Sequence, residues 1–254
     1  MNTEPIESGA PLLEIGERIA TITLRRPEVS NRLEASDLVE LIEHIEQVNA
    51  SDALVLRWRA LGKYFCSGFN INKLGVAKSV NFEDVARAIE NCRAITIAVL
   101  QGGIFGGATD LALRCDFRIA STNAQLHVPA VRLGAHFNLS ALQRFSSRLG
   151  IDNAKRILLA AEKFDAQAMK DCGYATALVA PDALHDYVQS MSEQFASSAP
   201  LPLLSMKKHL NRIAANTLDV DEFSVDFNKA FHSTDAQEGR VAWQERRPPR
   251  FTGN

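Results

Sequence analysis

Two glycine-containing segments are the first places where this sequence could carry chemistry. They are residues 62–70 (GKYFCSGFN) and 102–110 (GGIFGGATD), and each follows an apolar run that is typical of a β-strand. Ligands of α/β proteins bind where strands end, glycine lets a ligand approach the main chain, and the N–H groups at the start of a helix favour negative charge. The two segments therefore predict an oxyanion hole, a pair of main-chain N–H donors for a developing negative charge. Their glycine spacing is also typical of ordinary tight strand-to-helix turns.

Few side chains near these turns could move a proton. Asp110 follows Gly107 by three residues, so on a helix both would share one face and the carboxylate could point at a ligand bound there. His136 titrates near neutral pH and could act as a base if its ring pointed inward. A histidine beside a turn is more often a surface or hydrogen-bonded residue, and this applies still more to His127, at the end of an expected strand.

Several other kinds of site are disfavoured. No Gly-x-Gly-x-x-Gly opens the first strand–helix unit and the Walker lysine is missing, which argues against dinucleotide and phosphate-loop sites. The four cysteines lie far apart, so we expect reduced thiols in a cytoplasm and no metal site. A net charge of −2 gives no overall attraction to nucleic acid, and the longest apolar run, around residues 95–100, is too short to span a membrane. We therefore expect neither nucleic acid nor a membrane as a partner.

A sheet with helices packed against it must position the two turns. The hydropathy pattern predicts strands at 19–24, 53–58, 95–100 and 117–120, helices at 37–49 and 82–93, and a short helix that starts at Gly106 and Gly107. Ser36 and Asp37 are suited to cap the first of these helices. Strands that alternate with helices imply parallel pairing through right-handed crossovers. The predicted fold class is therefore α/β.

The second half of the chain is expected to be mostly helical, with one strand at 177–180. Helix starts and stops are indicated at Asp152, Asp165 and Gly173. Pro200 and Pro202 interrupt the chain before a last set of helices. We expect a core over residues 1–198 and a helical extension over 199–254, because a segment of fewer than about 60 residues would form only a marginal core alone.

Five short motifs follow one another along nearly the whole chain. They are residues 26–33 (RPEVSNRL), 62–71 (GKYFCSGFNI), 102–116 (GGIFGGATDLALRCD), 124–134 (AQLHVPAVRLG) and 238–251 (EGRVAWQERRPPRF). Each motif alone is weak, but the ordered series resembles the crotonase superfamily, the enoyl-CoA hydratases and isomerases. The resemblance implies a crotonase-like spiral of ββα units and a helical C-terminal region that forms a homotrimer, often stacked into a hexamer as a dimer of trimers.

The resemblance also implies a substrate and the groups that hold it. The substrate would be an acyl-CoA thioester, as in fatty acid metabolism, with coenzyme A as part of the substrate rather than a permanently bound cofactor. The N–H groups of Ser67 and Gly107 would hold the thioester carbonyl oxygen. Besides these two, five residues would border coenzyme A: Pro27, Val29, Asn70, Trp243 and Arg246. Trp243 and Arg246 would reach it from the C-terminal helix of the same or a neighbouring subunit.

Two positions depart from the family pattern. A hydratase of this family uses two glutamates, one three residues after the oxyanion glycine and one directly after the proline of the next segment, where this chain has Asp110 and Ala130. Asp110 keeps a carboxylate, shorter by one methylene. Ala130 can neither bind water nor move a proton, and the loss of one positioned acid or base commonly costs about 10² to 10⁴ in rate. Ordinary two-glutamate hydration is therefore disfavoured.

Three functions stay open at this point. The first is a hydratase or isomerase in which Asp110 is the acid/base group, with isomerisation less harmed because one base can shuttle its proton. The second is another reaction through the same enolate, such as C–C cleavage or decarboxylation, assisted by His136 or Asn138. The third is a non-catalytic acyl-CoA binder that kept the oxyanion hole and lost the chemistry.

Overall fold

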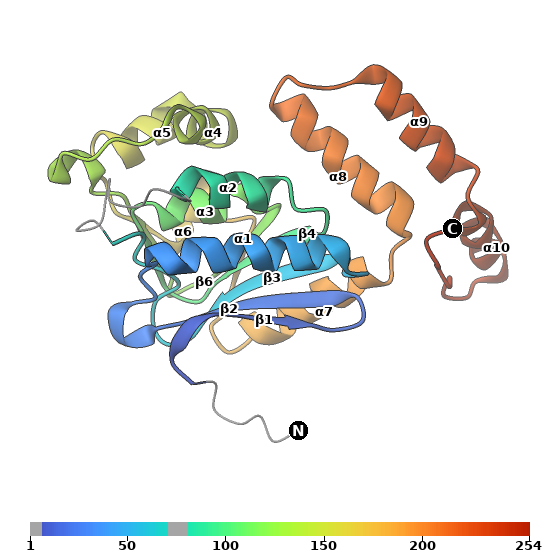
Figure 1. The fold of residues 1–254 in the computed structure, drawn as a ribbon, viewed down its shortest axis with the longest axis horizontal. Coiled ribbons are helices and arrows are strands. Elements are labelled where there is room, and N and C mark those ends of the chain that lie inside the picture. The colour runs from blue at the N-terminus through green and yellow to red at the C-terminus, as the bar shows by residue number, and fades with distance from the viewer. Residues whose placement is uncertain (1–6, 71–80) are drawn as a thin grey trace.

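A six-stranded sheet lies at the centre of the computed structural model, which describes residues 7–70 and 81–254 (Figure 1). Its strands, in order across the sheet, are β1 (Gly9–Ile15), β2 (Ile19–Arg25), β3 (Val55–Ala60), β4 (Ile95–Leu100), β6 (Phe117–Ser121) and β9 (Ala177–Val179). β1 and β2 pair antiparallel, and each later pair is parallel. The predicted mixed α/β class is confirmed.

A second, smaller layer of strands lies where the chain leaves the main sheet. It contains β5 (Gly103–Phe105), β7 (Gln125–His127) and β8 (Phe164–Asp165), in that order. Two isolated parallel bridges, Leu33 to Phe69 and Cys66 to Ile104, extend it toward the N-terminal half. The chain therefore passes from a long strand through a short extended segment into a helix, and this repeat places both glycine turns in the same layer.

Helices cover both faces of the main sheet. The core helices are α1 (Ala35–Ala50), α2 (Phe82–Glu90), α3 (Ala108–Arg114), α4 (Leu139–Leu149), α5 (Ile151–Leu158), α6 (Ala166–Asp171) and α7 (Leu184–Ala196). The larger apolar core includes Leu41 and Ile45 of α1 and Ile89 of α2, while α7 packs on the other face, against Ile97 of β4. Because β4 supplies residues to both cores, its continuous apolar run follows from burial on two faces.

Some boundaries differ from the sequence prediction. β1 was not expected, and the expected strand at 53–58 is β3, two residues later. α1 begins at Ala35, where the Asp37 carboxylate accepts a hydrogen bond from the N–H of the capping residue Glu34 (2.8 Å). Asp165 does cap α6 by accepting from the N–H of Ala168 (2.8 Å). Asp152 lies inside the first turn of α5 and caps nothing.

The C-terminal helices form a lobe beside the core (Figure 1). They are α8 (Pro200–Ala214), α9 (Val220–Phe231) and α10 (Thr234–Glu245). Pro200 begins α8 rather than breaking the chain before it, because the first helical turn tolerates proline. The buried Lys207 ammonium of α8 bonds the Asp116 carboxylate of the core (2.7 Å). This ion pair ties the lobe to the core, and the division at residue 198 stays a prediction.

Candidate functional site

The fold brings the two glycine turns together. The N–H of Phe65 donates to the carbonyl of Gly103 (2.9 Å), and the N–H of Phe105 donates to the carbonyl of Cys66 (3.0 Å). The N–H of Gly106 donates in turn to the carbonyl of His127 in β7 (3.0 Å). Hydrogen bonds to neighbouring strands therefore fix both turns, and the second turn leads directly into α3.

The N–H of Gly107 is one donor that this arrangement leaves open. Gly107 precedes the first residue of α3, and its N–H makes no hydrogen bond with any residue in the described ranges. Gly68 faces it: a Cβ added at Gly68 would lie 3.2 Å from the Gly107 nitrogen and 3.0 Å from the carbonyl oxygen of Phe105. Gly68 also has a φ of +93°, which side-chain-bearing residues rarely adopt. Glycine at 68 keeps the space in front of the donor empty.

The expectation that Ser67 supplies the second donor is corrected by the structure. The N–H of Ser67 donates to the carbonyl of Ser30 (2.9 Å), and its hydroxyl bonds the carbonyl of Val29 (3.4 Å). A donor already used in this way cannot also hold a ligand oxygen without breaking a main-chain bond. Ser67 instead fastens the first turn to the segment that follows β2.

The N–H of Phe69 is the donor that sequence reasoning missed. Leu33 bonds both neighbours of Phe69, donating to the carbonyl of Gly68 (2.9 Å) and accepting from the N–H of Asn70 (3.1 Å). In a parallel bridge of this kind the N–H of the residue between points away from its partner, here away from Leu33. Within residues 7–70 and 81–254 nothing accepts from it. Gly68 was the signal in the sequence that could have indicated this donor, because Phe69 directly follows the glycine at which the chain turns.

Asp110 lies one turn into α3 and is almost completely buried, with 1% of its surface exposed. One carboxylate oxygen, Oδ2, is 3.4 Å from Nε of Arg114, and the other, Oδ1, is 3.6 Å from Nε of Arg144. The second distance is too long for a hydrogen bond, and both atoms of that pair are buried without another partner among the described residues. Burial raises the pKa of Asp110, although the two guanidinium groups oppose the shift.

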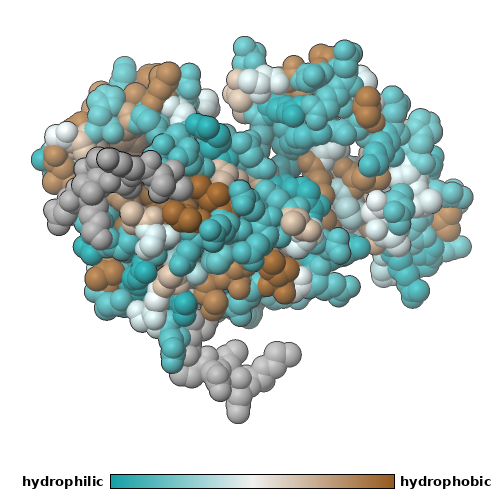
Figure 2. Space-filling model, in the orientation of Figure 1, coloured by the Kyte–Doolittle hydropathy of each residue, from teal (hydrophilic) through white to brown (hydrophobic). Residues whose placement is uncertain are grey.

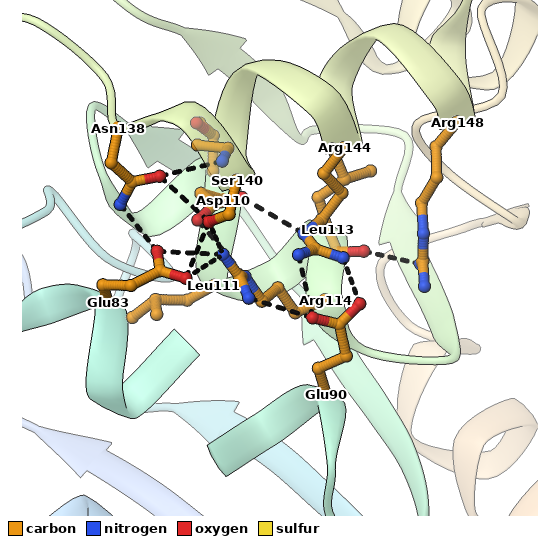
Figure 3. A network of polar contacts seen from close by, with 12 residues as sticks. Glu83, Glu90, Asp110, Leu111, Leu113, Arg114, Asn138, Ser140, Arg144 and Arg148 are labelled. Atoms are coloured by element: carbon orange, nitrogen blue, oxygen red, sulfur yellow. Dashed lines mark hydrogen bonds and ion pairs between the residues drawn. The ribbon is translucent and has the colours of Figure 1, made fainter. Parts of the chain in front are cut away.

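A network of ion pairs surrounds Asp110 and joins α2, α3 and α4 (Figure 3). Arg114 is its centre: its guanidinium bonds Glu83 and Glu90 of α2 (3.0 Å each) and the Ser140 hydroxyl of α4 (2.7 Å). Arg144 bonds Glu90 from α4 (2.8 Å). Burial acts to raise the pKa of Glu83, but hydrogen bonds from Ser140 and the charge of Arg114 outweigh it and lower that pKa. The network holds the helix that carries Gly107.

The other proposed acid/base residues serve local structure. Asn138 caps α4 by accepting from the N–H of Ala141 (2.8 Å) and donates to the Glu83 carboxylate (2.6 Å). His136 is exposed, and its Nδ1 lies 2.6 Å from the carbonyl of Phe137. Burial, Lys163 and Arg132 together lower the pKa of His127. These contacts do not favour a chemical role for His136 or Asn138, and that role stays a prediction.

The cysteine in the first turn is not a nucleophile. Cys66 is fully buried, and burial raises the pKa of its thiol to about 12. Reactive cysteines have lowered pKa values and some exposure. Any chemistry at this turn therefore falls to the main chain.

The residues expected to border coenzyme A separate into two groups. Pro27 and Val29 form a short 3-10 turn beside Ser67, and Asn70 is buried and donates to the Glu34 carboxylate (3.0 Å). The first group thus lies at the site. Trp243, 86% exposed, and Arg246 belong to α10, which lies away from α2 and α3 (Figure 1). Within one chain, these two do not join the turns.

A cleft of about 1010 Å³ lies elsewhere, between the core and the C-terminal lobe. Its wall includes Leu54 and Arg93, which stand just before β3 and β4, together with Lys208 and Arg212 of α8. The glycine turns follow the carboxyl ends of the same two strands. The cleft therefore lies at the amino ends of these strands, whereas the open N–H donors lie beyond their carboxyl ends.

The described residues contain neither a cluster of metal-ligating side chains nor a membrane-spanning helix. In residues 7–70 and 81–254, no three His, Cys, Asp or Glu side chains gather as a metal site would require. In the same ranges, every helix is too short or too polar to cross a bilayer.

Comparison with known proteins gives consistent matches over the length of the chain. A family model described as enoyl-CoA hydratase/isomerase matches residues 14–254. A protein named "Probable enoyl-CoA hydratase echA6" from Mycobacterium tuberculosis is 30% identical over 243 residues, which cover 93% of this chain and 97% of that protein. Methylmalonyl-CoA decarboxylase of Escherichia coli is 25% identical, covering 93% and 95%. A crystal structure of an enoyl-CoA hydratase/carnithine racemase from Magnetospirillum magneticum has a TM-score of 0.90 at 24% identity, covering 98% and 97%.

Proposed function

The chain belongs to the enoyl-CoA hydratase/isomerase family, and from this premise we propose that it binds an acyl-CoA thioester with the carbonyl oxygen between the N–H groups of Phe69 and Gly107. The observation that carries the proposal is that these two donors are open on either side of Gly68, where a side chain would fill the space between them. Coenzyme A is then part of the substrate and not a resident cofactor.

Two fixed donors suit the charge of a thioester enolate. When a proton leaves the carbon next to the thioester, the negative charge concentrates on the carbonyl oxygen. A preorganised N–H donor aimed at such an oxygen contributes about 3 to 4 kcal/mol to the transition state. Both turns are held by hydrogen bonds to neighbouring strands, so little reorganisation is needed as the charge forms.

The reaction that the site supports best is isomerisation of a 3-enoyl-CoA to a 2-enoyl-CoA through one base. The carboxylate of Asp110 would take a proton from C2, leaving the enolate, and return it to C4 as the double bond moves. Atoms and electrons balance without water. Hydration also needs a group that positions water, and Ala130 cannot supply one.

A second candidate is acyl-CoA binding without turnover, and one observation favours it. Asp110 lies between Arg114 and Arg144 and is almost completely buried, so its carboxylate could serve only to hold helices together. C–C cleavage or decarboxylation, the activity named for the E. coli relative, has no support from the contacts of His136 and Asn138.

The proposal extends to assembly. Trp243 and Arg246 do not reach the turns of their own chain, and the C-terminal lobe exposes large apolar side chains such as Phe227 and Leu210. Both facts support a homotrimer, or a dimer of trimers, in which α10 of a neighbouring copy completes the coenzyme A site.

A turnover and binding screen tests the proposed function. The protein is mixed with crotonyl-CoA and with 3-enoyl-CoA thioesters of short, long, branched and aromatic acyl groups, and products are identified by mass spectrometry while binding is measured by calorimetry. We expect binding of both classes, with isomerisation faster than hydration. Binding without any product would support the second candidate, and no binding of any thioester would exclude both.

A further inference from the structure

An aromatic side chain covers the carbon next to the Gly107 donor. Phe82, the first residue of α2, places its ring so that a Cβ added at Gly107 would lie 2.9 Å from one ring carbon and 3.2 Å from the next. The ring is only partly buried, although it packs against the main core. Phe82 therefore fills the side of Gly107 where another residue would carry its own side chain.

The residues on either side of Phe82 fasten the start of α2. Asn81 caps α2 by accepting from the N–H of Asp84 (3.1 Å). Glu83 bonds Arg114 of α3 (3.0 Å) and Ser140 of α4 (2.6 Å), so the first turn of α2 is fastened to the helix that begins beside Gly107. A shift of the first turn of α2 away from α3 would break these charged hydrogen bonds. The bonds therefore fix the backbone from which the Phe82 ring projects, and the ring also packs against the main core.

The position of the Phe82 ring beside Gly107 can be compared with where a bound thioester would lie. A carbonyl oxygen that accepts from Gly107 lies about 2.9 Å from its nitrogen. The thioester α-carbon, C2, is only about 2.4 Å from that oxygen, given standard bond lengths. C2 therefore lies within about 5 Å of the Gly107 nitrogen, and the Phe82 ring lies 2.9 Å from the Cβ position of the same residue, whereas the distal acyl chain can extend away from both. A branch on C2 that turns toward this side of Gly107 would meet the ring.

We propose that Phe82 is a specificity-determining residue which restricts the site to acyl-CoA thioesters without a substituent on C2. This rests on the proposed function, because it assumes that the thioester oxygen is held at Gly107. The substrate class is then an acyl-CoA thioester that is unbranched at C2. Phe82 places no restriction on the length of the acyl chain. The restriction at C2 holds equally for an isomerase and for a binder.

The test compares hexanoyl-CoA with 2-methylhexanoyl-CoA, which differ by one methyl group at C2 and are both saturated. Dissociation constants are measured by calorimetry for the wild type, Phe82→Ala, Phe82→Leu and a control, Phe195→Leu. Phe195 is a partly buried phenylalanine of α7 whose ring packs on Phe117, on the other face of the sheet. Circular dichroism and thermal unfolding show which variants fold, and the leucine variant serves if the alanine variant does not.

The wild type should bind hexanoyl-CoA at least about tenfold more tightly than its 2-methyl derivative, the usual range for one methyl group in a shaped pocket. Phe82→Ala and Phe82→Leu should bring this ratio close to one, and Phe195→Leu should leave it unchanged. A wild type that binds both thioesters equally, or a ratio unaltered in the Phe82 variants, would overturn the inference while leaving the proposed function intact. A wild type that binds neither thioester would overturn both.

Discussion

Gly68 is the residue on which the candidate site depends most. It stands between the two open donors, at a φ that disfavours any side chain, with main-chain atoms of Phe105 and Gly107 close by. Those atoms belong to paired strands and to the start of α3, so they cannot move aside as the end of a flexible side chain could. One added methyl group should therefore test the donors directly.

Gly68→Ala should lower turnover by about 10² to 10³, as the loss of an oxyanion donor does, and it should also weaken thioester binding because the added methyl group fills the space in front of the donors. The control is Gly134→Ala, because Gly134 also has positive φ (+66°) but a Cβ there would meet nothing within 4 Å. The control should lose about 1 kcal/mol of stability from backbone strain and no affinity. Calorimetry on both variants decides, and an unchanged affinity in Gly68→Ala would contradict the placement of the donors.

Asp110→Asn should lower the isomerisation rate by about 10² to 10⁴ if this carboxylate is the base. Burial raises the pKa of Asp110 above its ordinary value of 3.8, and only the ionised form can take a proton. The wild-type rate should therefore fall as the pH drops through that raised pKa. Initial rates across pH for both proteins check this, and equal rates would assign Asp110 a structural role and the proton transfer to another group.

At the scale of elements, helices α2, α3 and α4 are held together by charge as well as by apolar contact. Arg114 is buried, so each carboxylate that contacts it replaces water that the guanidinium lost on folding. Removing one partner leaves a buried charge less compensated. The start of α3, and with it the Gly107 donor, should depend on this network.

Glu83→Gln should lower the free energy of unfolding by about 2 to 3 kcal/mol at pH 7, the cost of losing a charged hydrogen bond. Because the pKa of Glu83 is lowered in the folded protein, its contribution is complete above its unfolded value near 4.5. The contribution is lost as the pH falls through the pKa of Glu83 in the folded protein. The difference in free energy of unfolding between variant and wild type should therefore shrink in acid. Urea unfolding at several pH values measures it. Glu162→Gln, in the exposed pair with Arg156, should leave the midpoint unchanged, and an equal loss there would argue against the network.

The elements were predictable where one periodicity dominates. The continuous apolar run of β4 and the stripe of Leu38, Leu41 and Ile45 on α1 gave nearly the observed boundaries. β1 escaped prediction because its seven residues contain glycine and proline and alternate only weakly between buried and exposed. Local pattern cannot supply the antiparallel partner that holds such a segment.

The site was predictable only in part, for a related reason. Glycine at 68 and 107 marked where a ligand could approach the main chain. Which N–H groups stay open depends on pairing with Leu33 and Ser30, residues more than thirty positions away. Whether Ser67 or Phe69 has the open N–H group depends on that pairing. The arginine network likewise joins three helices and has no local signature.

At the scale of the whole molecule, the C-terminal lobe carries more apolar surface than a solitary chain needs. Rings of Phe223, Phe227 and Phe231 stack along α9 with centroids 6.1 and 5.9 Å apart, and each ring is about half exposed. Brown, apolar surface is visible on this lobe in Figure 2. Large exposed apolar patches mark interaction sites, which supports contact between copies here.

Phe227→Glu should shift the protein toward monomers, because a carboxylate in an apolar interface is costly. Leu159→Glu is the matched control, since Leu159 is an exposed apolar residue of the core, 64% exposed. Size-exclusion chromatography with light scattering gives the mass of each. A monomeric wild type, or a Phe227→Glu protein of unchanged mass, would contradict assembly through α9.

The central claim is that two main-chain N–H groups hold the carbonyl oxygen of an acyl-CoA thioester. Isotope-edited infrared spectroscopy of hexanoyl-CoA labelled with ¹³C at the carbonyl tests it most directly, because hydrogen bonding to the oxygen weakens the C=O bond. The carbonyl band should move to lower wavenumber than in water on binding to the wild type, and bound to Gly68→Ala it should lie at higher wavenumber than in the wild-type complex. A thioester that binds the wild type with its carbonyl band unmoved would contradict the claim.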